Sequence, residues 1–154
     1  MPLLTDQFMS KNLRYTHPDE SLANVYHEMQ EYKIRHLPVL DKSGALVGII
    51  SDRDIWRSTD LKVSLVKDFM TSRVETAAVD TPLGEVTDKM IQNKISALVV
   101  VKNKHVVGVV THEDLLKVLR FFLKLPIDPR DSDKDFNAQT TIGTIMASIE
   151  EMGF

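Results

Sequence analysis

Residues 48–54 read Gly-Ile-Ile-Ser-Asp-Arg-Asp, and residues 108–114 read Gly-Val-Val-Thr-His-Glu-Asp. Both stretches consist of a glycine, two apolar residues, a hydroxyl residue, two polar residues and an aspartate. Earlier in the chain, identical residues recur at a spacing of 61, the distance from Met9 to Met70. The matched pairs are Phe8/Phe69, Met9/Met70, Asp19/Asp80, Leu22/Leu83, Val25/Val86, Met29/Met90, Ile34/Ile95, Leu37/Leu98 and Val39/Val100. Identities in constant register indicate an internal duplication.

The 154 residues are interpreted as one compact domain made of two similar repeats. A repeat of about 60 residues buries a small share of its surface and would be marginally stable alone. The two repeats are therefore expected to need each other, and a pseudo-symmetric cleft between them is where function is sought. We expect repeat 1 at residues 5–62, repeat 2 at residues 63–124, and a linker with an amphipathic helix at residues 125–154.

Composition limits the partners. The formal net charge of −3 gives no reason to expect nucleic acid or an anionic membrane as a partner. The chain contains no cysteine, which excludes disulfides and thiolate metal sites and fits a cytoplasmic protein. Residues 1–12 lack a basic segment followed by a long apolar one, so no signal peptide is expected. No stretch approaches the roughly 20 apolar residues that span a bilayer.

Each repeat is predicted to contain a strand, a helix, two strands and a second helix, so the fold class is α/β (α+β). Small polar residues and proline mark the helix starts, and turn residues between β-branched runs indicate hairpins. The near-continuous apolar strands favour sheets covered on both faces. The expected elements are strands 13–16, 36–40 and 45–50 with helices after 18–21 and from about 52, and strands 74–79, 97–101 and 105–110 with helices after 80–82 and from about 112.

The two closing motifs carry the sharpest chemical signal. Ser51 and Thr111 stand where a strand ends and a helix begins, where a hydroxyl can cap free N–H groups and help to hold a phosphate. Asp54 and Asp114 follow one helical turn later, where a carboxylate can accept hydrogen bonds from a pair of ribose hydroxyls. A capping box, which serves only the helix start, is the alternative. Two copies at equivalent places favour a binding site.

With these motifs the chain resembles the CBS-domain family, named after cystathionine β-synthase, in its tandem form. The resemblance covers residues 5–124 and rests on the repeats, on His36-Leu-Pro-Val-Leu-Asp41 before a glycine turn, and on the closing motifs. It implies a pseudo-twofold pair whose cleft binds a regulatory adenosine-containing ligand. Candidates are AMP, ADP, ATP, NAD and S-adenosylmethionine, with AMP, ADP or ATP expected first.

The resemblance also assigns residues. Asp54 and Asp114 match the family's ribose-binding aspartates, and Ser51 and Thr111 match its phosphate-side hydroxyls. The positions that match ligand-facing residues are Arg35, His36 and Pro38, with Ser96, Ala97 and Val99 as their counterparts in the second repeat.

The two copies are predicted to differ in charge. Arg35, His36 and Arg53 surround the first motif and could neutralise phosphate, although each arginine could equally be a solvated surface charge. The second motif offers only His112 as a possible cation, beside the repelling Glu113. The first-repeat site is therefore expected to dominate the binding of phosphate-bearing ligands.

Catalysis and metal binding are not expected. The five histidines show no metal-ligand spacing, and no cysteine assists them. No nucleophile elbow, Walker loop or dinucleotide-binding glycine turn is present. We therefore predict that the chain is not an enzyme and holds no metal.

Two hypotheses for the function stay open. The leading one is a ligand sensor that works as a homodimer, because the helix from about His112 is too apolar to be left in water. Its rival is a protein–protein scaffold with a vestigial nucleotide site that docks an effector through the apolar tail. The tail's predicted helical stripe consists of Ile142, Ile145, Met146, Ile149 and Met152, which pack on this fold, on a second copy or on an effector.

Overall fold

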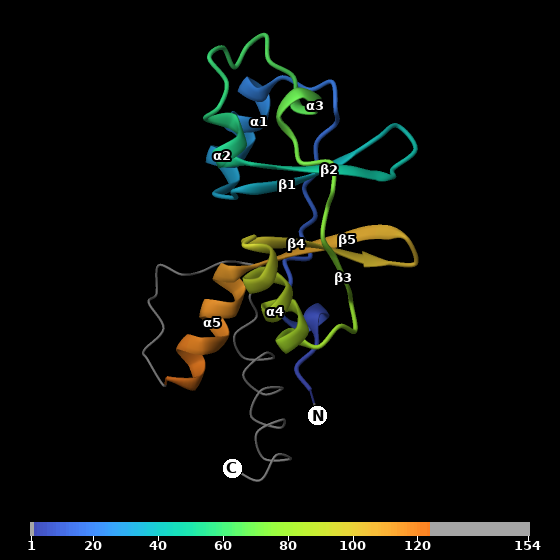
Figure 1. Cartoon of the computed structure of the whole chain (residues 1–154), viewed down its shortest axis with the longest axis vertical. Helices are drawn as coiled ribbons and strands as arrows, with labels where there is room; N and C mark the ends of the chain where they lie inside the picture. The colour runs from blue at the N-terminus through green and yellow to red at the C-terminus, as the bar shows by residue number, and fades with distance from the viewer. Residues whose placement is uncertain (1, 124–154) are drawn as a thin grey trace. The chain divides into compact units, whose positions relative to one another are not determined.

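The computed structural model describes residues 2–123, which divide into two compact units (Figure 1). The first-repeat unit contains residues 13–75 and 103–106. The second-repeat unit contains, among the described residues, 2–12, 76–102 and 107–123. The linker and amphipathic helix predicted at 125–154 lie outside the described residues.

The first-repeat unit packs helices against a two-stranded antiparallel sheet. Its elements are α1 (Leu22–Tyr32), β1 (His36–Leu40), β2 (Leu46–Ser51), α2 (Asp52–Ile55) and α3 (Val66–Phe69). The Ser21 hydroxyl accepts the N–H of Asn24 and so caps α1, as expected from the sequence. The core consists of Leu22, Val25, Met29, Leu37, Val39, Ile50, Ile55 and Val66.

The second-repeat unit has the same plan around a three-stranded sheet in the order β3-β4-β5. Its elements are the 3₁₀ turn η1 (Thr5–Gln7), β3 (Thr76–Ala78), α4 (Leu83–Asn93), β4 (Ala97–Lys102), β5 (His105–Thr111) and α5 (His112–Phe122), although the first two residues of β5 are grouped with the first-repeat unit. Its main core cluster consists of Ala77, Val86, Met90, Leu98, Val100 and Val110. The predicted α/β class and the order of the helices and hairpins are confirmed.

The strand predicted at 13–16 is wrong in extent, because only Thr16 pairs, in a parallel bridge to Val39. Thr16 donates its N–H to the carbonyl of Pro38, and Leu40 donates to the carbonyl of Thr16. The equivalent pairing in the second repeat, between β3 and β4, is three residues long and includes Val99. Pro38 stands where Val99 stands and has no N–H, so the ladder cannot extend.

The second helices also differ between the repeats. α2 has four residues, whereas α5 has eleven. Shortly after α2, the Ser58 hydroxyl accepts the N–H of Asp60, and the Asp60 carboxylate accepts the N–H of Lys62. These local hydrogen bonds compete with helix continuation, so α2 stops after one turn.

Each compact unit is completed by the segment that opens the other repeat in sequence. Ser10, near the start of repeat 1, donates its N–H to Val109 of β5 at 2.9 Å. Thr71, in repeat 2, exchanges two backbone hydrogen bonds with Ile49 of β2. The repeat boundary expected at residue 62 stays a prediction about the sequence, and the compact units exchange these opening segments.

Candidate ligand-binding site

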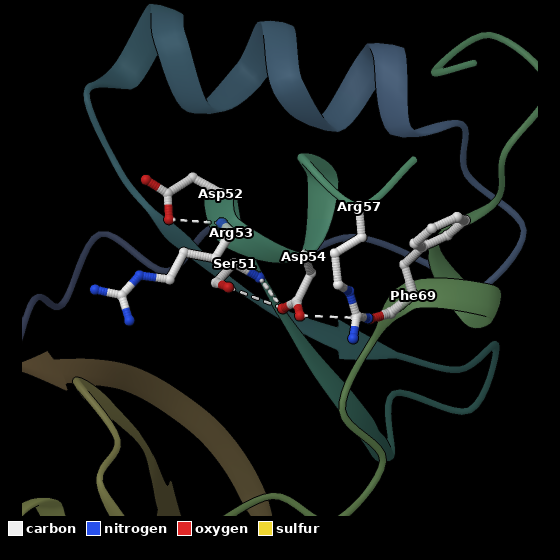
Figure 2. Close-up of polar contacts among 6 residues, drawn as sticks. All are labelled: Ser51, Asp52, Arg53, Asp54, Arg57 and Phe69. Carbon is white, nitrogen blue, oxygen red and sulfur yellow. Dashed lines mark hydrogen bonds and ion pairs between the residues drawn. The ribbon is translucent and has the colours of Figure 1, made fainter. Parts of the chain in front are cut away.

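The first closing motif forms a closed network of hydrogen bonds at the start of α2. The backbone N–H and the hydroxyl of Ser51 both donate to Oδ2 of Asp54, at 2.9 and 2.8 Å (Figure 2). In return the Ser51 hydroxyl accepts the backbone N–H of Asp54, which completes a capping box. The capping box expected as the alternative to a binding site is therefore formed. The capping box uses Oδ2 of Asp54 and does not involve Oδ1.

A further cation, Arg57, faces that second oxygen. Its Nη2 atom lies 3.5 Å from Oδ1 of Asp54 and donates to the carbonyl oxygen of Phe69 at 2.8 Å (Figure 2). The Arg57 side chain is 62% exposed, whereas that of Asp54 is 19% exposed. Arg57 was not predicted from the sequence as a site residue. The signal for it was an aspartate and a cation three residues apart in both copies, because Lys117 follows Asp114 at the same spacing.

The strand residues assigned to the first half of the site lie along β1, and Arg53 lies on α2. His36 pairs with Ser51 in the sheet, and the buried Pro38 pairs with Ile49. Arg35 is exposed, and its carbonyl accepts the N–H of Asp52 at 3.0 Å. Arg53 is exposed too, and its side chain extends away from the Asp54 carboxylate (Figure 2). The sheet register thus brings His36 to Ser51, whereas Arg53 takes no part in the Asp54 network.

The second closing motif repeats the geometry with a more buried ion pair. The N–H and the hydroxyl of Thr111 donate to Oδ2 of Asp114, at 2.8 and 3.1 Å. Nζ of Lys117 lies 3.8 Å from Oδ1 of Asp114, and these two side chains are only 14% and 15% exposed. The expectation that His112 is the only cation near this motif is therefore wrong, because Lys117 lies beside the aspartate. Sequence spacing alone did not show that the two side chains meet.

The strand residues of the second half of the site are placed as in the first. Ala97 and Val99 are buried on β4. The exposed His112 donates its backbone N–H to the carbonyl of Ser96 at 3.0 Å, and its Nδ1 lies 3.3 Å from the same oxygen. The contact between Asp52 and Arg35 in the first half is equivalent. In both halves, a backbone bond therefore ties the start of the second helix to the residue just before the first hairpin strand.

Burial raises the pKa of the Asp114 carboxyl above its usual value. The hydrogen bonds from Thr111 and the charge of Lys117 oppose this shift but do not cancel it. A carboxylate in this position is more costly to keep ionised than one in water. The ionised Asp114 side chain therefore lowers the stability of the folded protein relative to its neutral form.

That cost predicts that the difference in the free energy of unfolding between the wild type and Asp114→Asn depends on pH. Above the raised folded-state pKa the wild type carries the cost of the buried charge, and protonation relieves it as the pH falls towards the unfolded value of 3.8. The wild type should gain stability relative to Asp114→Asn over this window. Urea unfolding of both proteins at about pH 7, 5.5 and 4 measures the difference. The prediction would be contradicted if the stability difference between the two proteins did not change with pH, or if the wild type lost stability relative to Asp114→Asn as the pH fell.

Two further features of the described residues bear on other functions. Among residues 2–123, no helix is both long enough and apolar enough to cross a bilayer. In the same part of the chain, no three histidine, aspartate or glutamate side chains gather as metal ligands would.

The comparisons with known proteins identify the family. The family model described as the CBS domain matches residues 5–55 and again 66–120. A solved CBS domain pair in complex with 5′-methylthioadenosine and S-adenosyl-L-methionine is 32% identical, has a TM-score of 0.74, and aligns over 79% of this chain and 99% of its own.

Enzymes are also among the relatives. Inosine-5′-monophosphate dehydrogenase of Methanocaldococcus jannaschii is 33% identical over 73% of this chain. Homoserine O-acetyltransferase of Methanohalobium evestigatum is 38% identical over 61% of it. The matches span only 23% and 19% of those two enzymes. Since the two family matches cover the repeats and both closing motifs, the chain belongs to the CBS domain family and carries the domain as a tandem pair.

Proposed function

We propose that this chain is a non-catalytic regulatory module that binds an adenosine-containing ligand, with AMP, ADP or ATP as the first candidates. Asp54 takes the ribose hydroxyls in this proposal. The observation that carries it is that the two Asp54 oxygens have different neighbours: Ser51 donates to Oδ2, whereas Oδ1 lies 3.5 Å from Nη2 of the exposed Arg57. A carboxylate oxygen has lone pairs to accept further donors, such as the hydroxyls of a ribose.

The comparisons support an adenosine-containing ligand. Both compounds in the solved relative, 5′-methylthioadenosine and S-adenosyl-L-methionine, contain adenosine. The enzyme relatives support a regulatory role, because the part that they share with this chain is about a quarter of their length or less. Catalytic residues of those enzymes can therefore lie in the three quarters that this chain does not match.

The first half of the site is proposed to dominate the binding of phosphate-bearing ligands. Arg57 is 62% exposed beside Asp54, and Arg35 and His36 lie at the adjoining start of β1. The second half has Lys117, but that side chain is 14% exposed and lies in a pair with Asp114. An exposed guanidinium has further N–H donors that can reach a phosphate while Nη2 keeps its bond to Phe69, whereas a buried ammonium must first leave its carboxylate.

A thermal-shift screen tests the proposed function. AMP, ADP, ATP, NAD and S-adenosylmethionine are added separately to the purified chain. Guanosine triphosphate and pyrophosphate, which contain phosphate but no adenosine, serve as controls. A ligand that binds only the folded state stabilises it by about 2.7 kcal/mol at a hundredfold excess over Kd, so at least one adenosine compound should raise Tm by several degrees. Equal shifts with all compounds, or no shift and no heat in calorimetry, would contradict it.

We further propose that the module is a homodimer. Three leucine or phenylalanine side chains of α5, namely Leu116, Leu119 and Phe122, are 56%, 50% and 46% exposed. Apolar side chains that recur on one helix are commonly covered by a partner. Light scattering at micromolar concentration should give about twice the chain mass of 17.5 kDa. A mass that stays at that of one chain would contradict the proposal.

A further inference from the structure

We propose that Arg57 couples ligand binding at Asp54 to the segment Phe69–Thr71, from which the chain continues into the other compact unit. This inference deepens the proposed function and rests on it for the ligand, although its mechanical part can be tested without one. Arg57 acts here as a positioning residue, because it holds two parts of the first-repeat unit together.

A single nitrogen atom of Arg57 makes both contacts. Nη2 donates to the carbonyl oxygen of Phe69 at 2.8 Å and lies 3.5 Å from Oδ1 of Asp54. The first contact is a short charge-assisted hydrogen bond, and the second is a looser ion pair. Arg57 thus links the proposed ribose carboxylate to the end of α3 (Figure 2).

The segment that Arg57 holds lies along the strand that presents the closing motif. Thr71 exchanges two backbone hydrogen bonds with Ile49 of β2, at 2.9 and 3.0 Å, and the Met70 side chain packs onto Gly48. β2 itself ends at Ser51. Beyond Thr71 the chain reaches β3 at Thr76, which belongs to the second-repeat unit. A change at Phe69–Thr71 therefore acts a few residues before one of the places where the chain passes from one unit to the other.

A bound ribose would restrict the Arg57 guanidinium. A ribose hydroxyl that donates to Oδ1 of Asp54 can also accept a hydrogen bond from the guanidinium, because a hydroxyl is both donor and acceptor. The Arg57 side chain is 62% exposed and has several N–H donors, so it can contact such a hydroxyl and keep its bond to Phe69. The bond to Phe69 then persists for a larger fraction of the time.

Hydrogen exchange with ATP as the probe tests the coupling. The reporters are the amides of Met70 and Thr71, which donate to Val66 and Ile49. Saturating ATP should slow their exchange in the wild type by about fivefold, the effect of roughly 1 kcal/mol. Arg57→Gln should bind ATP more weakly, because the guanidinium adjoins the proposed site, so the ATP concentration is raised until calorimetry shows that this variant is saturated. At saturation the slowing should be absent from Arg57→Gln. Arg73→Gln, which removes the same charge from an exposed position of the same unit, should behave as the wild type.

The outcomes separate the coupling from the proposed function. If ATP binds to the wild type and the exchange of these amides is unchanged, or if Arg57→Gln keeps the slowing, the coupling is overturned and the ligand site stands. If no adenosine compound binds, the proposed function fails, and the ligand-free proteins decide the coupling. There, Asp54→Asn should speed the exchange of Met70 and Thr71 in the wild-type background but not in Arg57→Gln. Equal effects in both backgrounds would overturn it.

Discussion

Replacing Gly108 with alanine should lower the free energy of unfolding by about 2–3 kcal/mol, the upper range for overpacking a tight contact. A Cβ atom at this position would collide with the backbone carbonyl oxygen of Ser10 and lie 2.9 Å from Sδ of Met9. Ser10 is also paired with Val109, so the carbonyl cannot withdraw without breaking that pairing. The damage would fall on the contact that places the N-terminal segment in the second-repeat unit.

Gly48 provides the matched comparison. A Cβ there would lie 2.5 Å from Sδ of Met70 and 3.2 Å from the carbonyl oxygen of Thr71. A methionine side chain can move at low cost, so Gly48→Ala should cost only about 1 kcal/mol.

Gly84, near the start of α4, provides the opposite control. No atom of the described residues lies within 4 Å of the place that an added Cβ would take, so Gly84→Ala should stabilise the protein by about 0.5 kcal/mol. Urea unfolding of the three variants gives the order of their stabilities. A Gly108→Ala variant no less stable than Gly48→Ala would contradict the expected order.

Replacing Asp54 with alanine should weaken nucleotide binding by a factor of ten or more. Losing a hydrogen bond to a charged group costs about 1.5–3 kcal/mol, and each 1.4 kcal/mol is about a tenfold change in Kd. Asp114→Ala should do less, because Asp114 is held in a buried pair with Lys117 while Asp54 has the accessible Arg57. Calorimetric titration of AMP and ATP into each variant measures both effects.

The capping boxes make a stability control necessary. Both aspartates accept hydrogen bonds from their helix starts, so each substitution should also lower stability by about 1 kcal/mol. Asp68→Ala removes the same charge from an exposed position on α3 and should change neither affinity nor stability by much. Equal losses of affinity at Asp54 and Asp114 would refute the asymmetry. Unchanged affinity in both would refute the binding site and leave two helix caps.

Most of the local structure could be predicted from the sequence, because it depends on residues close together in the chain. Ser51 and Asp54, like Thr111 and Asp114, are three residues apart, and a helix start brings such a pair together whatever surrounds it. Because the two repeats match residue by residue, each local prediction made for the first repeat could also be made for the second. The strand at 13–16 failed because its length depends on a partner with an N–H, and Pro38 has none.

The candidate site could be predicted only in part. The repeated motifs located its aspartates and hydroxyls, and the resemblance to a family supplied the adenosine ligand. The electrostatic partners were not predicted, because exposure decides whether a cation is available. Arg57 and Lys117 occupy equivalent positions, three residues after the motif aspartates, yet one side chain is 62% exposed and the other 14%. The two closing motifs end before these cations and share one pattern, so the motifs do not indicate which cation is exposed.

The duplication, the order of helices and strands and the two capping boxes follow from the amino-acid sequence alone, because periodicity and short-range hydrogen bonds determine them. Tertiary structure decides which segment completes which unit and which cation meets which carboxylate. Ser10 pairs with Val109, and Arg57 reaches the carbonyl of Phe69, across separations of 99 and 12 residues. Contacts of this kind depend on how folded elements pack against each other. Each segment could pair with many others, and a local sequence pattern does not indicate which partner is preferred.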